Sequence, residues 1–177
     1  MQPSINALVI MGVAGCGKSS VGHAIATRTG AAFIEGDQFH PAANIAKMSS
    51  GIPLDDDDRA GWLARLGEEL CKATRNGGRA VLTCSALRHA YRRQLRQAVP
   101  GLGFVYLELT RETAGERVAN RPDHFMPASL IDSQFAALEP PTVEPLTLVL
   151  DATQPVDQLS RQAESWWKSM DALARQA

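Results

Sequence analysis

The residues from Gly12 to Ser19 constrain the chain most, because they fit the pattern glycine, any four residues, glycine, lysine, and serine or threonine. In such a loop the glycines let backbone N–H groups turn inward, where they and the following helix N-terminus bind phosphate oxygens. Lys18 then reaches the β- and γ-phosphates, and the Ser19 hydroxyl is a ligand for Mg²⁺. The apolar run 8–11 predicts a strand before the loop, and residues 20–27 predict a helix after it, which is the order that such a loop needs. We therefore expect a nucleotide phosphate site formed by Gly12, Val13, Ala14, Gly15, Cys16, Gly17, Lys18, Ser19 and Ser20.

Length and composition limit the partners of the chain. Its 177 residues, 45% of them hydrophobic, suit one globular domain over residues 1–177. A net charge of -1 argues against nucleic acid and anionic membranes as partners. Three cysteines without a Cys-x-x-Cys spacing argue against a disulfide framework and a zinc site. Because no apolar run approaches the ~20 residues of a membrane span and the first residues lack signal-peptide features, we expect a cytoplasmic protein with small-molecule partners.

Periodic apolar residues predict the remaining elements. Further strands are expected at 32–35, 80–84, 104–109 and 146–150, and helices at 41–48, after the acidic run 55–58, at 88–99, 112–120 and 129–138, and from 156 to the end. Strands that alternate with helices predict a parallel sheet covered on both faces. Trp166 and Trp167 lie on the apolar face of the last helix, so we expect them in the core. The prolines at 122 and 127 suggest that the segment from about 121 to 138 forms a lid.

Polar side chains follow the second expected strand, at the sheet edge where ligands of open α/β sheets bind. Asp37 comes directly after that strand, and His40, Asn44 and Lys47 follow at spacings that place them on one helical face. This face would suit a polyhydroxylated substrate, and the alternative is a solvated helix surface.

Two pairs of arginines have the same helical spacing. Arg88 and Arg92 follow Ser85 beyond the third strand, where two guanidinium groups suit a carboxylate or a phosphate. Arg117 and Arg121 lie at the start of the expected lid, where closure would bring them to phosphate oxygens. For both pairs the alternative is an ordinary exposed basic surface.

The acidic run from Asp55 to Asp58 has two interpretations. It resembles a metal site, but negative charge is also favoured at a helix N-terminus, and we prefer this structural explanation. The sequence Asp58-Arg59-Ala60-Gly61 has the Asp-x-x-Gly form of a GTPase switch, but it follows a polar loop and the chain has no Asn/Thr-Lys-x-Asp guanine motif. We therefore do not interpret these residues as a GTPase switch region.

Several stretches form a set that is far more specific than the phosphate-binding loop alone. They are Glu35-Gly36-Asp37-Gln38-Phe39-His40-Pro41 with Asn44 and Lys47-Met48, Gly51-Ile52-Pro53-Leu54-Asp55-Asp56-Asp57-Asp58-Arg59 with Trp62, Cys84-Ser85-Ala86-Leu87-Arg88 with Tyr91-Arg92, and His124-Phe125-Met126 with Ser133-Gln134-Phe135 and Leu138-Glu139. With this set the chain resembles the small P-loop gluconokinases over nearly its whole length. The resemblance implies an α/β, P-loop NTPase-like three-layer fold with a five-stranded parallel sheet in the order 2-3-1-4-5, a lid and commonly a homodimer. It also implies ATP-dependent phosphorylation of D-gluconate at its C6 hydroxyl, which gives 6-phospho-D-gluconate and ADP.

On this basis each candidate residue is given a role. We expect Asp37 to orient the attacking hydroxyl and accept its proton, Lys18 to hold ATP, and Ser19 to hold Mg²⁺. Arg117 and Arg121 would close on the phosphates. The residues expected to bind the substrate are Asp37, His40, Lys47, Arg59, Ser85, Arg88, Arg92 and Gln134. Two alternatives stay open: a related kinase of shikimate or a nucleoside monophosphate, and a nucleotide-responsive binding protein without useful turnover.

Overall fold

The computed structural model describes residues 4–121 and 129–176. The elements in this part of the chain are β1 (Ala7–Met11), α1 (Lys18–Thr29), β2 (Ala32–Glu35), the 3₁₀-helix η1 (Gly36–Phe39), α2 (Ala42–Ser49), α3 (Asp56–Thr74), the 3₁₀-helix η2 (Arg75–Gly77), β3 (Ala80–Thr83), α4 (His89–Ala98), β4 (Leu102–Glu108), α5 (Arg111–Ala119), α6 (Ser129–Ala137), β5 (Thr147–Asp151) and α7 (Val156–Gln176). The expected strands and helices are all present, with ends that shift by one or two residues. None of the helices in these ranges combines the length and the apolar character that crossing a bilayer requires.

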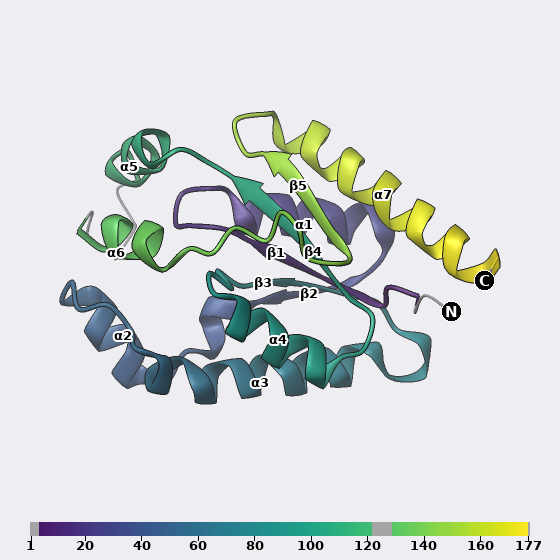
Figure 1. Cartoon of the computed structure of the whole chain (residues 1–177), viewed down its shortest axis with the longest axis horizontal. Helices are drawn as coiled ribbons and strands as arrows, with labels where there is room; N and C mark the ends of the chain where they lie inside the picture. The colour runs from purple at the N-terminus through teal and green to yellow at the C-terminus, as the bar shows by residue number, and fades with distance from the viewer. Residues whose placement is uncertain (1–3, 122–128, 177) are drawn as a thin grey trace.

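The five strands form one parallel sheet in the order β2-β3-β1-β4-β5, which confirms the expected order. Val9, in the middle of β1, is level with Leu82 on β3 and with Phe104 on β4. Because all strands run the same way, their carboxyl ends meet at one edge of the sheet. The loops that carry the candidate site residues leave from this edge (Figure 1).

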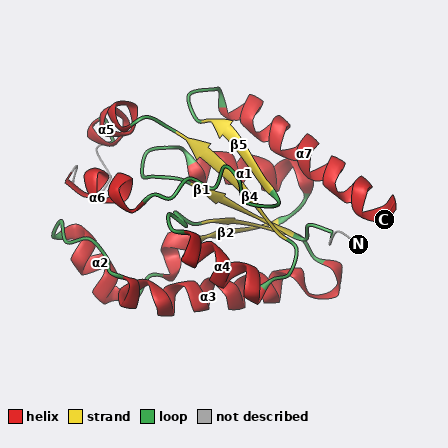
Figure 2. Cartoon of the chain, viewed as in Figure 1, coloured by secondary structure: helices red, strands yellow, loops and turns green. Residues whose placement is uncertain are grey.

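Helices cover both faces of the sheet, so the architecture has three layers (Figures 1 and 2). Successive side chains of a strand point to opposite faces, and β1 shows this clearly. Leu8 and Ile10 belong to a core shared with α1 and α7, whereas Val9 and Met11 belong to a core shared with α3 and α4. Both faces of β1 are therefore fully buried, which explains its continuous apolar run.

The C-terminal helix α7 closes one face through Trp167. This side chain is fully buried, and its indole N–H donates to the carbonyl of Ile5 at 2.8 Å. The guanidinium carbon of Arg79 lies 3.7 Å from the centre of its ring, a cation–π contact. Trp166 is partly buried against the same core. The prediction that both tryptophans pack in the core is confirmed.

The turn after β2 comes very close to β3. A Cβ on Gly36 would lie 2.0 Å from the carbonyl oxygen of Thr83, so only glycine fits here. The backbone N–H of Gly36 donates to the Thr83 hydroxyl at 3.2 Å, and this hydroxyl donates to Glu35. These contacts fix the start of η1 and with it the position of Asp37.

Candidate active site

The loop between β1 and α1 has the geometry of a phosphate cradle. Gly12, Gly15 and Gly17 have φ values of 146°, 83° and 94°, which residues with a Cβ rarely adopt. The Nζ atom of Lys18 donates to the carbonyls of Gly12 and Val13, both at 3.1 Å. The loop thus curves around the lysine ammonium, and its N–H groups lead into the N-terminus of α1.

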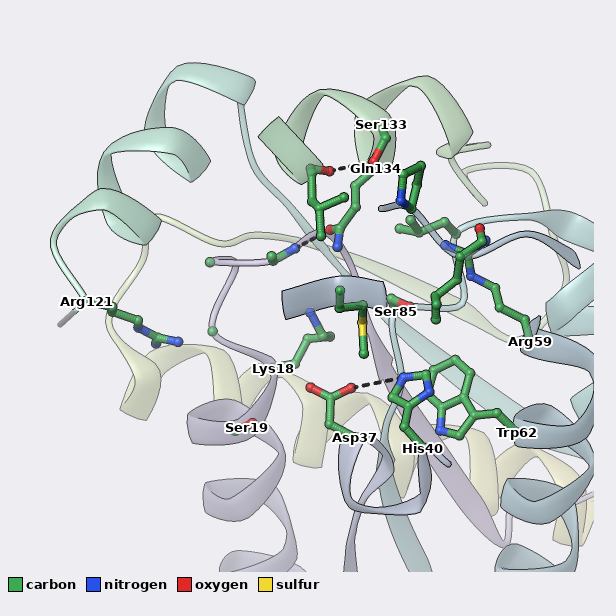
Figure 3. A pocket seen from close by; sticks show the side chains of 18 residues that line it. Lys18, Ser19, Asp37, His40, Arg59, Trp62, Ser85, Arg121, Ser133 and Gln134 are labelled. Carbon is green, nitrogen blue, oxygen red and sulfur yellow. Dashed lines mark hydrogen bonds and ion pairs between the residues drawn. The ribbon is translucent and has the colours of Figure 1, made fainter. Parts of the chain in front are cut away.

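A cavity of about 150 Å³ opens between this loop, the end of β2, α3 and α6 (Figure 3). Eleven of the residues predicted for the site line it, and they come from six separate segments of the chain: Ala14, Gly15, Gly17, Lys18, Ser19, Asp37, His40, Arg59, Ser85, Arg121 and Gln134. Asp37 is the one acidic residue among the lining residues that the structure describes. The cavity therefore combines three cationic side chains with a single carboxylate.

Asp37 and His40 project from the turn after β2 toward the phosphate-binding loop (Figure 3). The Asp37 side chain is 67% exposed, whereas that of His40 is 4% exposed. The His40 ring stacks on Trp62 with centroids 3.9 Å apart, and the Trp62 indole donates to the carbonyl of Gly36 at 2.9 Å. Burial lowers the pKa of His40; the Asp37 carboxylate acts in the opposite direction, and Arg59 lowers the pKa further.

Arg59 enters the cavity from the first turns of α3. Its guanidinium donates to the carbonyl of Leu54 and lies 3.4 Å from the Tyr91 hydroxyl. It also lies over the Tyr91 ring, 5.5 Å from the centre. These contacts hold a permanent positive charge at the side of the cavity opposite Lys18, which suits a substrate carboxylate.

The helix α6 carries Gln134 over the loop. The Gln134 side-chain oxygen accepts the backbone N–H of Ala14 at 2.7 Å. Ser133 and Leu130 on the same helix also line the cavity. Within the expected lid, Gln134 therefore contacts the phosphate-binding loop directly, whereas residues 122–128 lie outside the described residues.

A second, more open cavity of about 420 Å³ lies beyond the loop, toward α7. It is lined by Gly15, Cys16, Gly17, Ser20, Val21, Arg117, Asn120, Arg121, Ala152, Gln154, Val156 and Leu159. Arg117 donates to the carbonyls of Gly15 and Ala152 at 3.2 and 3.1 Å. Arg121 lines both cavities, but Arg117 lines only this one. The two arginines thus share the second cavity, and Arg121 also reaches the first.

Three other predicted substrate residues do not line the first cavity. Lys47 donates to both carboxylate oxygens of Asp58, at 2.9 and 2.7 Å, and so joins α2 to α3. This bond raises the pKa of Lys47 and lowers that of Asp58. Arg88 is exposed and forms the N-cap position of α4.

Arg92, the third, is 1% exposed and belongs to a buried ion-pair cluster. Its guanidinium donates to the Glu144 carboxylate and to the carbonyls of Ala86 and Glu139. Arg96 also pairs with Glu144, at 2.7 Å. These contacts fasten the segment between α6 and β5 onto α4. Contrary to the prediction, Arg92 has a structural role, because its donors are taken up by protein oxygens.

Glu144 should contribute strongly to stability. Burial alone would raise its pKa, but hydrogen bonds from Arg92, Arg96 and His89 outweigh this and lower the pKa from 4.5 to about 2. A shift of this size corresponds to about 3 kcal/mol. Glu144→Gln should therefore lower the free energy of unfolding by about that amount at neutral pH, as measured by urea denaturation.

The pH dependence gives a second check. The folded-state pKa of Glu144 is depressed, so its contribution is complete above about 4.5 and disappears as the pH falls toward about 2. The difference between wild type and Glu144→Gln should shrink over that window. Glu69→Gln, which removes a carboxylate from surface pairs on α3, is the matched control and should stay close to wild type. Equal stability of Glu144→Gln and wild type at neutral pH would contradict the assignment.

The acidic run at the start of α3 is a helix cap. The Asp55 carboxylate accepts the backbone N–H of Asp58 at 2.7 Å, and the Asp58 carboxylate accepts that of Asp55 at 3.0 Å. This is a capping box, which satisfies two backbone N–H groups that the helix leaves unpaired. Over residues 4–121 and 129–176, no group of three or more His, Cys, Asp or Glu could hold a metal ion. The structural explanation of the run is supported.

Sequence reasoning left out several residues that shape the cavity. Trp62 supports the His40 ring, while Met48, Leu54 and Leu130 form a small apolar cluster at its border. Trp62, Met48 and Leu54 belong to the stretches that carried the family resemblance, which was the available signal for them. The apolar residues look like ordinary core in the sequence.

The fold and the site together define a class, that of P-loop kinases of small molecules, in which the phosphate-binding loop faces a polar substrate cavity. A family model described as an AAA domain matches residues 8–141. The gluconokinase of Gluconobacter oxydans is 49% identical over 134 residues, which cover 76% of this chain and 75% of that protein. The chain belongs to the gluconokinase family.

Solved structures agree with this assignment. The crystal structure of a gluconokinase from Sinorhizobium meliloti is 45% identical, with a TM-score of 0.87 over 99% of each chain. A sugar kinase from a Janibacter species is 41% identical, with a TM-score of 0.88 over 96% of this chain and 98% of that one.

Proposed function

We propose that this protein transfers the γ-phosphoryl group of ATP to the C6 hydroxyl of D-gluconate, giving 6-phospho-D-gluconate and ADP. The observation that carries the proposal is the joint lining of one cavity by Lys18, Asp37 and Arg59. These supply a phosphate-binding cation, a carboxylate for the reacting hydroxyl and a cation for the substrate carboxylate. Members of the family with 37–49% identity are named gluconokinases, which supports this choice over a shikimate or nucleoside monophosphate kinase.

Each group then has a chemical task. The loop N–H groups and Lys18 bind the β- and γ-phosphates, and Asp37 orients the hydroxyl and accepts its proton. Arg121 is placed to stabilise the charge that develops on the transferred group. The nucleotide base and ribose would occupy the second cavity, where Arg117 braces the wall through Gly15 and Ala152. Ser85 and Gln134 complete the wall of the substrate cavity.

The residues present fit a magnesium ion that is bound together with ATP. Ser19 lies in the first turn of α1 and lines the cavity, so its hydroxyl is the protein ligand we propose. β3 ends at Thr83, and Cys84 and Ser85 follow it without a carboxylate, so phosphate oxygens and water would supply most other ligands. Such an ion neutralises developing phosphate charge.

Three parts of the proposal rest mainly on the sequence. The lid role of residues 121–138 is supported in addition by the Gln134 contact to the loop. The homodimer follows from the family resemblance. The cysteine pattern supports the proposed cytoplasmic location.

The test of the proposal is substrate preference. Glucose offers similar hydroxyls but no carboxylate, so it would leave Arg59 without its partner, at a cost of about 2 kcal/mol or more. We expect kcat/KM to favour gluconate over glucose by at least about 30-fold in a coupled assay of ADP release. Arg59→Met should erode this preference more than it changes the KM for ATP.

Arg88→Met is the matched control, because it removes a cation outside the cavity. If Arg88→Met erodes the preference and Arg59→Met does not, the carboxylate binds at the start of α4. Equal use of gluconate and glucose by the wild type would overturn the sugar-acid assignment. ATP binding without any phosphorylated product would favour a binding protein.

A further inference from the structure

The hydrogen bonds of Asn44 determine where His40 carries its proton. Asn44 is 3% exposed, and its amide nitrogen lies 2.9 Å from the backbone carbonyl of Asp58. A carbonyl oxygen can only accept, so the atom facing it must be the NH₂ group, which fixes the orientation of the amide. The same nitrogen lies 3.3 Å from Nδ1 of His40.

It follows that Nδ1 of His40 is the acceptor. A protonated Nδ1 would place two donors against each other, which excludes both the Nδ1–H tautomer and the imidazolium ion. The neutral ring then has its proton on Nε2. The buried position of the ring against Trp62 also favours the neutral form.

The Nε2 atom points toward Asp37 across a gap that suits one oxygen atom. Nε2 and the Asp37 Oδ1 atom are 3.9 Å apart, which is too long for a direct hydrogen bond (Figure 3). An oxygen about 2.8 Å from each atom would lie to one side of the line that joins them and bridge the two. A hydroxyl there would accept from the imidazole, donate to the carboxylate and keep one lone pair for attack.

We propose that Asn44 is a positioning residue that holds His40 as the Nε2–H tautomer, so that His40 and Asp37 together fix the rotation of the acceptor hydroxyl. The identity of the hydroxyl that His40 and Asp37 hold rests on the proposed function, whereas the tautomer of His40 does not. With the opposite tautomer, the Nε2 lone pair would compete with Asp37 for the hydroxyl proton. Asn44 therefore acts through His40 without lining the cavity.

The tautomer can be read directly by NMR. In protein labelled with ¹⁵N-histidine, correlation of ring nitrogens with carbon-bound protons separates the two tautomers and the cation. The chain has four histidines, and the signal lost in His40→Gln identifies that of His40. At neutral pH we expect Nε2 protonated and Nδ1 unprotonated in the substrate-free enzyme. A cation or the Nδ1–H form would overturn the proposal.

Substitution of Asn44 tests the cause. Asn44→Leu removes the amide donor and keeps a side chain of similar size. The His40 signals should then shift toward a mixture of tautomers. Lys47→Met is the matched control, because it breaks another bond between α2 and α3 but none to His40, and the pattern should stay as in wild type. An unchanged pattern in a folded Asn44→Leu protein would overturn the role of Asn44.

Activity gives an independent readout that needs no Asn44 variant. The amide of a glutamine falls near the imidazole Nε2 position, and that of an asparagine near Nδ1. The kcat/KM of His40→Gln for gluconate should therefore be about 10-fold above that of His40→Asn, because a factor of this size corresponds to roughly one hydrogen bond. The KM for ATP should be similar in the two variants. The reverse order would contradict the proposal. The predicted NMR pattern in a protein that does not phosphorylate gluconate would support the tautomer and overturn the proposed substrate.

Discussion

Lys18→Met should leave the protein folded and lower kcat with gluconate by at least about 10²- to 10³-fold. The ammonium group lies at the centre of the phosphate-binding loop, where negative charge builds up during phosphoryl transfer. Methionine keeps most of the length of the side chain and removes its charge. The measurement is kcat from ADP release at saturating ATP and gluconate, with circular dichroism to confirm the fold.

Lys168→Met provides the comparison for this result. Lys168 is an exposed lysine on α7 that pairs with Glu164 at 2.8 Å, far along the chain from the loop. Its replacement should leave kcat near the wild-type value. Near-normal turnover by a folded Lys18→Met protein would remove Lys18 from the catalytic assignment.

The sequence predicted the fold well because its signals are local. Each strand has its own apolar run, and the alternation of strands and helices allows few arrangements. The phosphate-binding loop is contiguous, so its glycines and Lys18 could be read together. The capping box of Asp55 and Asp58 is local as well, and helix-start electrostatics pointed to a helix N-terminus at these residues. The sheet order, by contrast, came with the family resemblance.

The roles of Arg59 and Arg92 could not be separated from the sequence. Arg92 and Arg59 are both arginines in helices near the sheet edge, and nothing in their immediate neighbours separates their roles. The carboxylate that pairs with Arg92 belongs to Glu144, 52 positions further along. The carbonyl that fixes Arg59 belongs to Leu54, in the loop before its own helix. Packing against a distant segment therefore decided the position of the Arg92 guanidinium, whereas the carbonyl that fixes Arg59 is local.

Helical spacing also did not predict which residues at or near α2 line the cavity. His40 precedes α2 in an extended conformation, so the three residues do not share one helical face, and of the three only His40 lines the cavity. Lys47 and Asn44 are both bonded to Asp58 at the start of α3. Periodicity says which residues share a face, but the partner that covers this face depends on tertiary packing.

Asp37→Asn should lower kcat by about 10²- to 10⁴-fold, the usual contribution of a positioned group that accepts a proton. Asparagine is nearly isosteric but is not a base, so the hydroxyl can still bind while its proton has no acceptor. The KM for ATP should change little, because the loop and Lys18 hold the phosphates. Full kinetics in both substrates separate these effects.

Glu35→Gln tests whether the loss is specific to position 37. Glu35 lies at the end of β2 and accepts a hydrogen bond from the Thr83 hydroxyl, which a glutamine oxygen can also accept. The Glu35→Gln substitution also removes one negative charge, but two residues before Asp37 and outside the residues that line the cavity. Glu35→Gln should therefore retain far more kcat than Asp37→Asn. If Asp37→Asn instead raised only the KM for ATP, Asp37 would belong to the metal or nucleotide site, and another group would have to take the hydroxyl proton.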